Sequence, residues 1–229
     1  MLPASLDGMH APPILRGGRA ARALWLVLGL FFCAVGILCF LEAKLGLPPW
    51  DVLHQGIARN TPLSFGAANE TVGLIVVVIG WRLGARIGIG TLANALLIGA
   101  FIILIQHLNV LQRFASAPLG ARIVLLAAGL ACFGVGTALY IGADLGAGPR
   151  DSLMLVGARR SGVRVGLVRA ALELSVLGVG FALGGTVGIG TLVFALGIGP
   201  AVELAFHAVS QTSLVGARAG AGIPVRVRG

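Results

Sequence analysis

The sequence repeats itself after one hundred residues. Residues 45–53 read LGLPPWDVL and residues 145–153 read LGAGPRDSL, so both stretches place a proline, one further residue and an aspartate in the same order. The same shift aligns two identical GIGTL segments, at 88–92 and 188–192, without a gap. A fixed period of this kind indicates a duplicated structural unit, so the fold has to accommodate that unit twice.

Long apolar runs make up most of each unit. The chain is 57% hydrophobic and only 11% charged, whereas a soluble domain carries roughly 25% charged residues. The runs approach the roughly 20 residues that a membrane-spanning helix needs, and the first is too long for the core of a signal peptide. We therefore expect an all-α, polytopic membrane protein with six transmembrane helices, over residues 23–41, 63–81, 88–107, 123–143, 165–183 and 188–208.

The repeat divides the chain into five expected segments. In order they are a disordered tail (1–21), a first unit (22–107), a linker (108–121), a second unit (122–208) and a basic tail (209–229). Each unit also holds a short helix, since residues 50–60 are too few and too polar to cross a bilayer. Asp51 follows two prolines and is able to cap the exposed backbone N–H groups of that helix. We expect this helix, and its equivalent near Asp151, to lie at the interface or to re-enter the bilayer.

The distribution of positive charge indicates an orientation. Three spans per unit is an odd number, so the second unit is predicted to be inverted relative to the first. With the N-terminus in the cytoplasm, the inside segments carry Arg16, Arg19, Arg22, Arg82, Arg86, Arg150, Arg159, Arg160, Arg164, Arg169, Arg218, Arg226 and Arg228. The outside segments carry Lys44, Arg59, Arg113 and Arg122. This bias favours two inverted three-helix repeats with both termini inside, whereas a parallel duplication would need the short helices to span the membrane.

The two short helices are the first candidates for a binding site. Inverted repeats with short or broken helices near the membrane midplane are a recurring plan of transporters. A helix that starts inside the bilayer points N–H groups into the protein, and they carry roughly half a positive charge. We predict that Trp50, Asp51, Arg150 and Asp151 shape a substrate site in which Arg150 neutralises an anion. The alternative is that the aspartates cap helices, Trp50 anchors at the interface and Arg150 follows the charge rule.

Ionisable residues inside the expected spans are candidates for proton or ion coupling. Glu70 and Glu173 lie within spans, where a carboxylate usually faces a partner or a wet cavity. On the repeat, Glu70 is equivalent to Ala170, one helical turn from Glu173, so both glutamates project from nearly the same face. Glu203 and His207 are spaced to meet on one face of the last helix. The alternatives are a structural hydrogen bond for each glutamate and a simple interfacial pair for the last two.

Motifs of other functional classes are missing. Cys33, Cys39 and Cys132 lie in apolar runs with no metal-binding spacing, and their odd number does not suggest a disulfide framework. The sequence has no HExxH or CxxC, and GIGTL lacks the lysine of a phosphate-binding loop. The net charge of +9 comes mostly from arginines beside apolar runs, which points to a membrane and not to nucleic acid. We expect no metal, no cofactor and no enzymatic activity.

The motifs resemble those of one bacterial family. GLPPWDVLHQGIAR, YIGADLGAGPRDSLMLVGARR and the two GIGTL copies are similar to the YczE/YyaS/YitT family of integral membrane proteins, and especially to its YczE-like branch. The resemblance covers residues 22–208 and implies a multi-pass protein of the bacterial plasma membrane. It implies no reaction, because the family has no agreed substrate. YitT-like members carry a soluble C-terminal domain that this sequence does not contain.

Two functions remain open at this point. The first is a small-solute transporter or permease-like protein, whose partners are the lipid bilayer and an unknown solute. The second is a non-transporting accessory or scaffold protein that regulates a partner complex, or that associates with a second copy of itself. A transporter requires a water-accessible cavity lined by Glu70, Glu173 and the motif loops. A scaffold requires an external helix face that fits another membrane protein.

Overall fold

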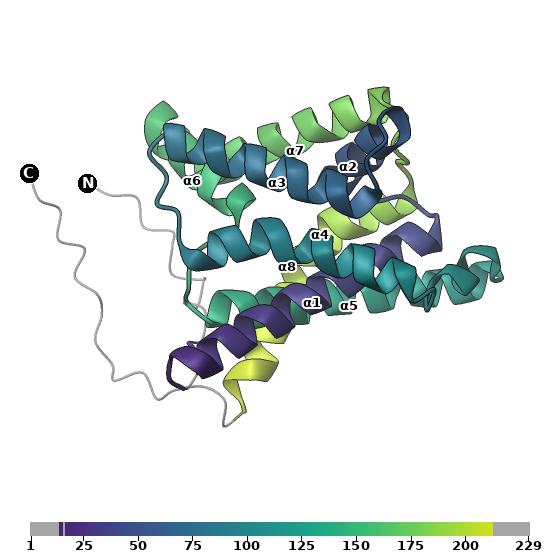
Figure 1. The fold of residues 1–229 in the computed structure, drawn as a ribbon, viewed down its shortest axis with the longest axis horizontal. Helices are drawn as coiled ribbons and strands as arrows, with labels where there is room; N and C mark the ends of the chain where they lie inside the picture. Colours follow the sequence, from purple (N-terminus) through teal and green to yellow (C-terminus); the bar gives the residue numbers. More distant parts are fainter. Residues whose placement is uncertain (1–13, 16, 213–229) are drawn as a thin grey trace, which may run out of the picture.

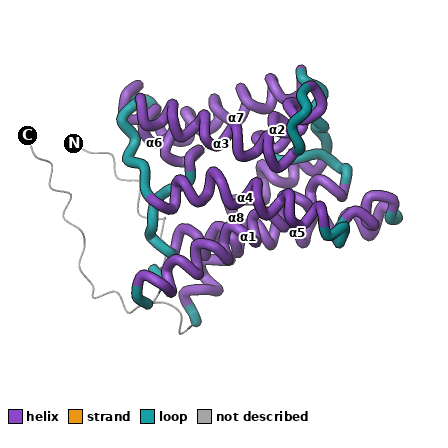
Figure 2. Tube along the Cα trace, viewed as in Figure 1, coloured by secondary structure: helices purple, strands orange, loops and turns teal. Residues whose placement is uncertain are grey.

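The computed structural model describes residues 14, 15 and 17–212. Most of the two expected tails therefore lies outside the described residues. The described part is helical and contains no strand (Figure 2). Its elements are α1 (Arg19–Ala43), α2 (Pro49–Asn60), α3 (Phe65–Arg82), α4 (Ile89–His107), a 3-10 turn η1 (Gln112–Ser116), α5 (Leu119–Gly142), α6 (Pro149–Ser161), α7 (Val165–Ala182) and α8 (Ile189–Ser210).

The helices α1, α3, α4, α5, α7 and α8 are long and apolar enough to cross a membrane. The predicted all-α class and the six spans are therefore confirmed. The other two helices, α2 and α6, have 12 and 13 residues and occupy the two motif stretches. Each begins at its motif proline, because a proline at the first helical position has no N–H to leave unsatisfied.

The capping interpretation of the motif aspartates is wrong. Neither short helix has a side-chain hydrogen bond to its N-terminal backbone. Asp51 Oδ1 instead lies 3.0 Å from His54 Nδ1, and Asp151 Oδ2 accepts a hydrogen bond from Tyr140. Both aspartates sit in the first turn, where a negative charge still interacts favourably with the helix dipole. Their side chains face other parts of the protein instead of closing the ends of their own helices.

The helices α1 and α5, which are equivalent in the two units, cross at the centre of the molecule through glycines. A Cβ atom on Gly29 would lie 2.7 Å from the Gly136 carbonyl oxygen, and one on Gly36 would lie 2.9 Å from the Gly129 oxygen. Small residues let two helix backbones approach this closely in a membrane. Because residue 29 meets residue 136 and residue 36 meets residue 129, α1 and α5 run antiparallel.

The motif loop of each unit binds the GIGTL turn of the other unit. The Gly190 N–H donates to the Leu45 carbonyl at 2.7 Å, and the Gly90 N–H donates to the Leu145 carbonyl at 2.9 Å. A side chain at Gly190 would place a Cβ atom 2.5 Å from the Gly46 carbonyl oxygen. The glycines of GIGTL therefore permit a close backbone approach, and the partner is the motif loop of the opposite unit.

Two arginines tie the units together in the same reciprocal way. Arg22 Nε donates to the Ala143 carbonyl at the end of α5, at 2.7 Å. Arg122 Nε donates to the Ala43 carbonyl at the end of α1, also at 2.7 Å. The last carbonyls of a helix have no partner within the helix, so each arginine satisfies the C-terminus of the other unit's first span.

The remaining helices cover two sides of this centre. Figure 1 shows α3 and α7 along the upper side and α1, α5 and α8 along the lower side, with α2 and α6 toward opposite ends. The short helix of each unit packs on the other unit, since α2 contacts α7 and α6 contacts α3. Residues of the two motif helices are thereby brought into the space between the units.

Candidate functional site

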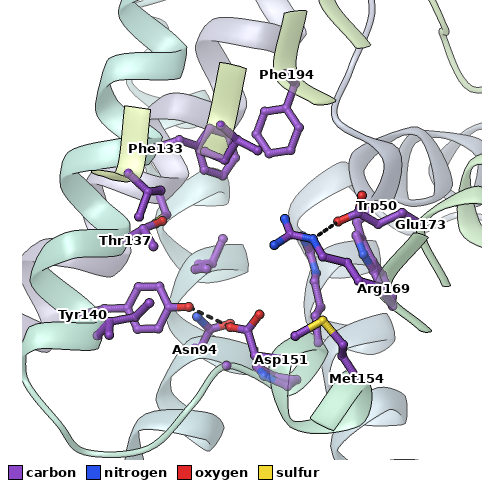
Figure 3. Close-up of a pocket in the computed structure, with 18 of the residues that line it drawn as sticks. Trp50, Asn94, Phe133, Thr137, Tyr140, Asp151, Met154, Arg169, Glu173 and Phe194 are labelled. Atoms are coloured by element: carbon purple, nitrogen blue, oxygen red, sulfur yellow. Dashed lines mark hydrogen bonds and ion pairs between the residues drawn. The ribbon is translucent and has the colours of Figure 1, made fainter. Parts of the chain in front are cut away.

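A cavity of about 350 Å³ lies between the two units (Figure 3). One wall is apolar and comes from the long helices. The rings of Phe133 on α5 and Phe194 on α8 pack edge to face there, with their centroids 5.1 Å apart. The opposite parts of the lining come from α6 and α7 and contain charged groups. The cavity thus combines an apolar wall with a few polar side chains, as small-molecule sites do.

The two motifs meet in this cavity. Trp50 and Arg150 occupy equivalent positions of the two units, and both line the cavity. The Arg150 guanidinium carbon lies 4.9 Å from the centroid of the Trp50 ring system, which is within the range of a cation–π interaction. The duplication therefore places an aromatic ring and a cation at one equivalent position, and the fold stacks one on the other.

Arg150 has no oxygen partner in the part of the chain that the structure describes. Among residues 17–212, no hydrogen bond or ion pair to its guanidinium is found beyond the contact with Trp50. Burial lowers the pKa of Arg150, while the nearby carboxylates of Asp51 and Asp151 act in the opposite direction. An arginine keeps its charge in proteins because its reference pKa exceeds about 12, so the cavity contains a guanidinium cation.

The other charged groups of the lining have partners. Tyr140 Oη donates to Asp151 Oδ2 at 3.0 Å. Arg169 Nε donates to Glu173 Oε1 at 2.9 Å, one turn apart on α7. Figure 3 shows these two pairs on different sides of the cavity, with the Arg169 guanidinium turned toward its interior. Arg169, which the charge count assigned to the cytoplasmic side, lies near the start of α7 and lines the cavity.

Asp51 lies behind the cavity in a buried polar cluster. The side chains of Asp51 and His54 are fully buried, and Asn69 Nδ2 of α3 lies 3.1 Å from His54 Nδ1. Burial lowers the pKa of His54, and its hydrogen bond to Asp51 raises it. The second carboxylate oxygen of Asp51 and Nε2 of His54 have no hydrogen-bond partner among the described residues. Asp51 thus acts on the cavity through its charge and not as part of the lining.

The remaining predicted coupling residues do not reach the cavity. Glu70 lies between α3 and α4, where its Cγ atom occupies the space beside Gly99. Glu203 and His207 are exposed. His207 Nε2 lies 2.7 Å from the Gln211 side-chain amide nitrogen, and within residues 17–212 no hydrogen bond or ion pair joins it to Glu203. The i, i+4 spacing permits contact between Glu203 and His207, but His207 contacts Gln211 instead.

Four site residues were not anticipated from the sequence. His54 lies three positions after Asp51, and Arg169 lies four positions before Glu173, so helical spacing is a signal that could have identified both. Asn69 is a polar residue inside an apolar run, which is a weaker signal. Tyr140 gave no signal, since one tyrosine in a spanning helix does not indicate its partner.

The two units differ in how their last two helices pack. In the first unit, α3 packs on α4, and a Cβ atom on Gly66 would lie 2.7 Å from the Gly99 carbonyl oxygen. The equivalent residues of the second unit are Gly166 and Gly199, and a Cβ atom on either would meet no atom of the described residues within 4 Å. Only Gly180 is buried on α7. The α3–α4 interface is therefore closed, while the α7–α8 interface beside the cavity is open.

Comparisons with known proteins identify a family, but the family has no assigned activity. A model of the family of unknown function DUF6198 matches residues 20–207. An uncharacterized protein of Haemophilus influenzae is 34% identical over 209 residues, which cover 86% of this chain and 93% of that protein. The uncharacterized membrane protein YczE of Bacillus subtilis is 35% identical over 170 residues, which cover 73% of this chain and 77% of YczE. No solved structure matches significantly.

Proposed function

Since the chain belongs to the family of unknown function DUF6198 and is related to YczE, we propose its function from its own structure: it is a small-solute transporter or permease-like protein. The relationship to YczE confirms the family that the motifs indicated. The proposed location is the plasma membrane of a bacterium, with both termini in the cytoplasm, as the distribution of arginines favours.

The observation that carries this proposal is the difference between the two glycine contacts. Gly66 and Gly99 are in contact in the closed α3–α4 interface. The equivalent positions 166 and 199 are also glycines, but they are not in contact because the α7–α8 interface is open. In transporters with repeated units, one unit moves against the other around a fixed central site. If the units exchange these two arrangements, α7 closes on α8 and α3 separates from α4. Access to the cavity then changes sides.

The antiparallel crossing of α1 and α5 supports the inverted arrangement that this mechanism needs. Equivalent helices that run in opposite directions across a membrane belong to units of opposite orientation. The reciprocal bonds of Arg22 and Arg122 are also what a two-fold relation between the units produces. Alternating access through an inverted repeat follows from such a relation, because each half is able to adopt the arrangement of the other.

The cavity residues take distinct roles in the proposed transport. Trp50, Arg150 and Asp151 contact the solute, and the Arg169–Glu173 pair on the mobile helix α7 couples its passage to a proton or another cation. Asp51 and His54 adjust the charge around Arg150 from behind the cavity. The proposed role involves no catalytic reaction, and the alternative is the accessory or scaffold protein described above.

Cysteine accessibility tests the proposal. Cys33, Cys39 and Cys132 are replaced, and single cysteines are introduced as Thr137→Cys in the cavity and as Thr61→Cys and Ser161→Cys at the C-terminal ends of the two short helices. All three are near-isosteric, and positions 61 and 161 are equivalent and exposed. Intact cells and inverted vesicles are labelled with a membrane-impermeant thiol reagent.

We expect position 61 to react from outside, position 161 from inside, and position 137 from the side to which the cavity opens. Reaction of positions 61 and 161 from the same side would refute the inverted repeat. An unreactive Thr137→Cys, with both loop positions labelled, would exclude a water-filled cavity and favour the accessory or scaffold function.

A further inference from the structure

Among the charged side chains of the cavity lining, one has no oxygen or nitrogen partner within the described residues. Asp151 receives a hydrogen bond from Tyr140, and Arg169 is paired with Glu173. Arg150 has the face of Trp50 but, within residues 17–212, no acceptor for its N–H groups. Arg150 is half-buried and lines the cavity, so its N–H groups face water or a ligand there. A ligand that displaces this water has to bring oxygen acceptors of its own, because an N–H group left without an acceptor costs binding free energy.

The geometry of the Arg150 guanidinium favours one kind of oxygen-bearing group in the ligand. A guanidinium is planar and presents five N–H donors in a rigid fork, which matches the two oxygens of a carboxylate. Stacking on an aromatic ring uses the face of this plane and leaves the donors at its edges free. Trp50 thus fixes the orientation of the fork but supplies none of the hydrogen bonds that the fork can make.

The rest of the cavity limits the size and charge of the ligand. Its volume of about 350 Å³ is near the lower end of small-molecule sites, and Phe133 and Phe194 form an apolar wall. The carboxylates of Asp151 and Glu173 also line the cavity. These negative charges repel a doubly charged anion such as phosphate more strongly than a single carboxylate.

We propose that the cavity binds a small organic monocarboxylate, with its carboxylate on the edge of Arg150 and its apolar body against Phe133 and Phe194. This assignment rests on the proposed transport function and specifies the class of solute. A plain fatty acid and an apolar α-amino acid share this chemistry, and the experiment separates them. The amino group of the second would lie near Asp151 or Glu173.

Binding is measured as ligand-dependent thermal stabilisation of the full chain purified in detergent, because a ligand that binds only the folded state raises the midpoint of unfolding. The probes are hexanoate and leucine, with hexanamide and hexylamine as controls of similar size. The variants are Arg150→Gln and Arg150→Lys. Arg159→Gln is the matched control, since Arg159 lies on the same helix, is exposed and is absent from the cavity lining.

We expect hexanoate, leucine or both to stabilise the wild-type chain, and neither hexanamide nor hexylamine to do so. Arg150→Gln should weaken binding by about 10- to 100-fold, the range for loss of a hydrogen-bonded charge. The affinity of Arg150→Lys should lie between those of the wild type and Arg150→Gln, since lysine keeps the charge but lacks the planar fork of N–H donors. Arg159→Gln should bind as the wild type does.

Stabilisation by hexanamide equal to that by hexanoate, or equal binding by wild type and a folded Arg150→Gln, would overturn the assignment. If neither Arg150 variant folds, the comparison of hexanoate and hexanamide on the wild-type chain decides. Binding of hexylamine alone would also overturn the monocarboxylate assignment. In that case a reactive Thr137→Cys would still support the proposed transport function. Carboxylate binding with an inaccessible Thr137→Cys would support the ligand class and refute transport.

Discussion

Alanine at Gly99 and at Gly199 should affect the protein in different ways, although the two positions are equivalent in the repeat. In the closed interface, a Cβ atom on Gly99 would lie 2.5 Å from the Gly66 carbonyl oxygen and would also contact the Cγ atom of Glu70. The glutamate side chain is able to move aside, but the backbone oxygen of α3 is not. In the open interface, a Cβ atom on Gly199 would have no atom of residues 17–212 within 4 Å.

The magnitude follows from a comparison of the two variants. Forcing an extra carbon into a tightly packed contact costs about 1 to 3 kcal/mol. Replacing glycine by alanine inside a helix returns up to about 1 kcal/mol. This gain in helix stability is the same in both variants and cancels in the comparison. Gly99→Ala should therefore be less stable than Gly199→Ala by about 1 to 3 kcal/mol.

The free energies of unfolding are compared in detergent by denaturant titration, with helix content followed by circular dichroism. Equal stabilities, or a less stable Gly199→Ala, would refute the idea that only the α3–α4 interface is closed. The proposed transport cycle adds a second expectation, because closure of α7 on α8 would bring a Cβ atom on residue 199 against α7. Gly199→Ala should therefore remain stable and bind its solute, yet transport more slowly than the wild type.

Three further predictions concern the polar contacts. Arg122→Ala removes two hydrogen bonds to the end of α1 and should lower the free energy of unfolding by about 1 to 2 kcal/mol, whereas the exposed Arg82→Ala should leave it nearly unchanged in the same titration. Burial lowers the pKa of His54, so the folded state binds fewer protons than the unfolded chain, whose histidine has a pKa of about 6.5. The stability from neutral His54 is complete above about pH 6.5 and is lost as the pH falls toward the lowered pKa. His54→Gln should then flatten the pH dependence of unfolding between about pH 7 and 5, and an unchanged slope would contradict this. Tyr140→Phe removes the hydrogen bond to Asp151 and should cost about 1 kcal/mol, measured against the wild type by thermal unfolding in the same detergent.

The sequence alone predicts the secondary structure well because a membrane leaves few choices. A backbone in lipid has to satisfy its hydrogen bonds within its own segment, so each long apolar run forms a helix. The two prolines of the motifs, at residues 49 and 149, predict where the short helices begin, and the structure places their first residues there. The orientation of the units across the membrane remains a prediction from charge, supported by the antiparallel crossing of α1 and α5.

The composition of the site depends on contacts that no local pattern encodes. The repeat indicated Trp50 and Arg150 as equivalent residues, but only the packing of one unit against the other stacks them. The spacing of Glu203 and His207 permits contact without forcing it, and both side chains are exposed. Asn69 reaches His54 because α2 packs on α3, which is a tertiary relationship.

The duplicated sequence determined that there are two units, three spans and one short helix in each, and glycines at matching positions, because lipid and backbone geometry act on each segment separately. Gly66 and Gly99 recur as Gly166 and Gly199, so these glycines did not reveal that the first interface is closed and the second open. Gly73, which packs on Ala95 in the closed interface, has Glu173 as its equivalent, but this difference does not by itself say how α7 and α8 are arranged. Only the tertiary structure decided which interface is closed and which is open. Two helix pairs that share these glycines are able to pack or to separate, and the balance depends on the whole assembly of helices around the cavity.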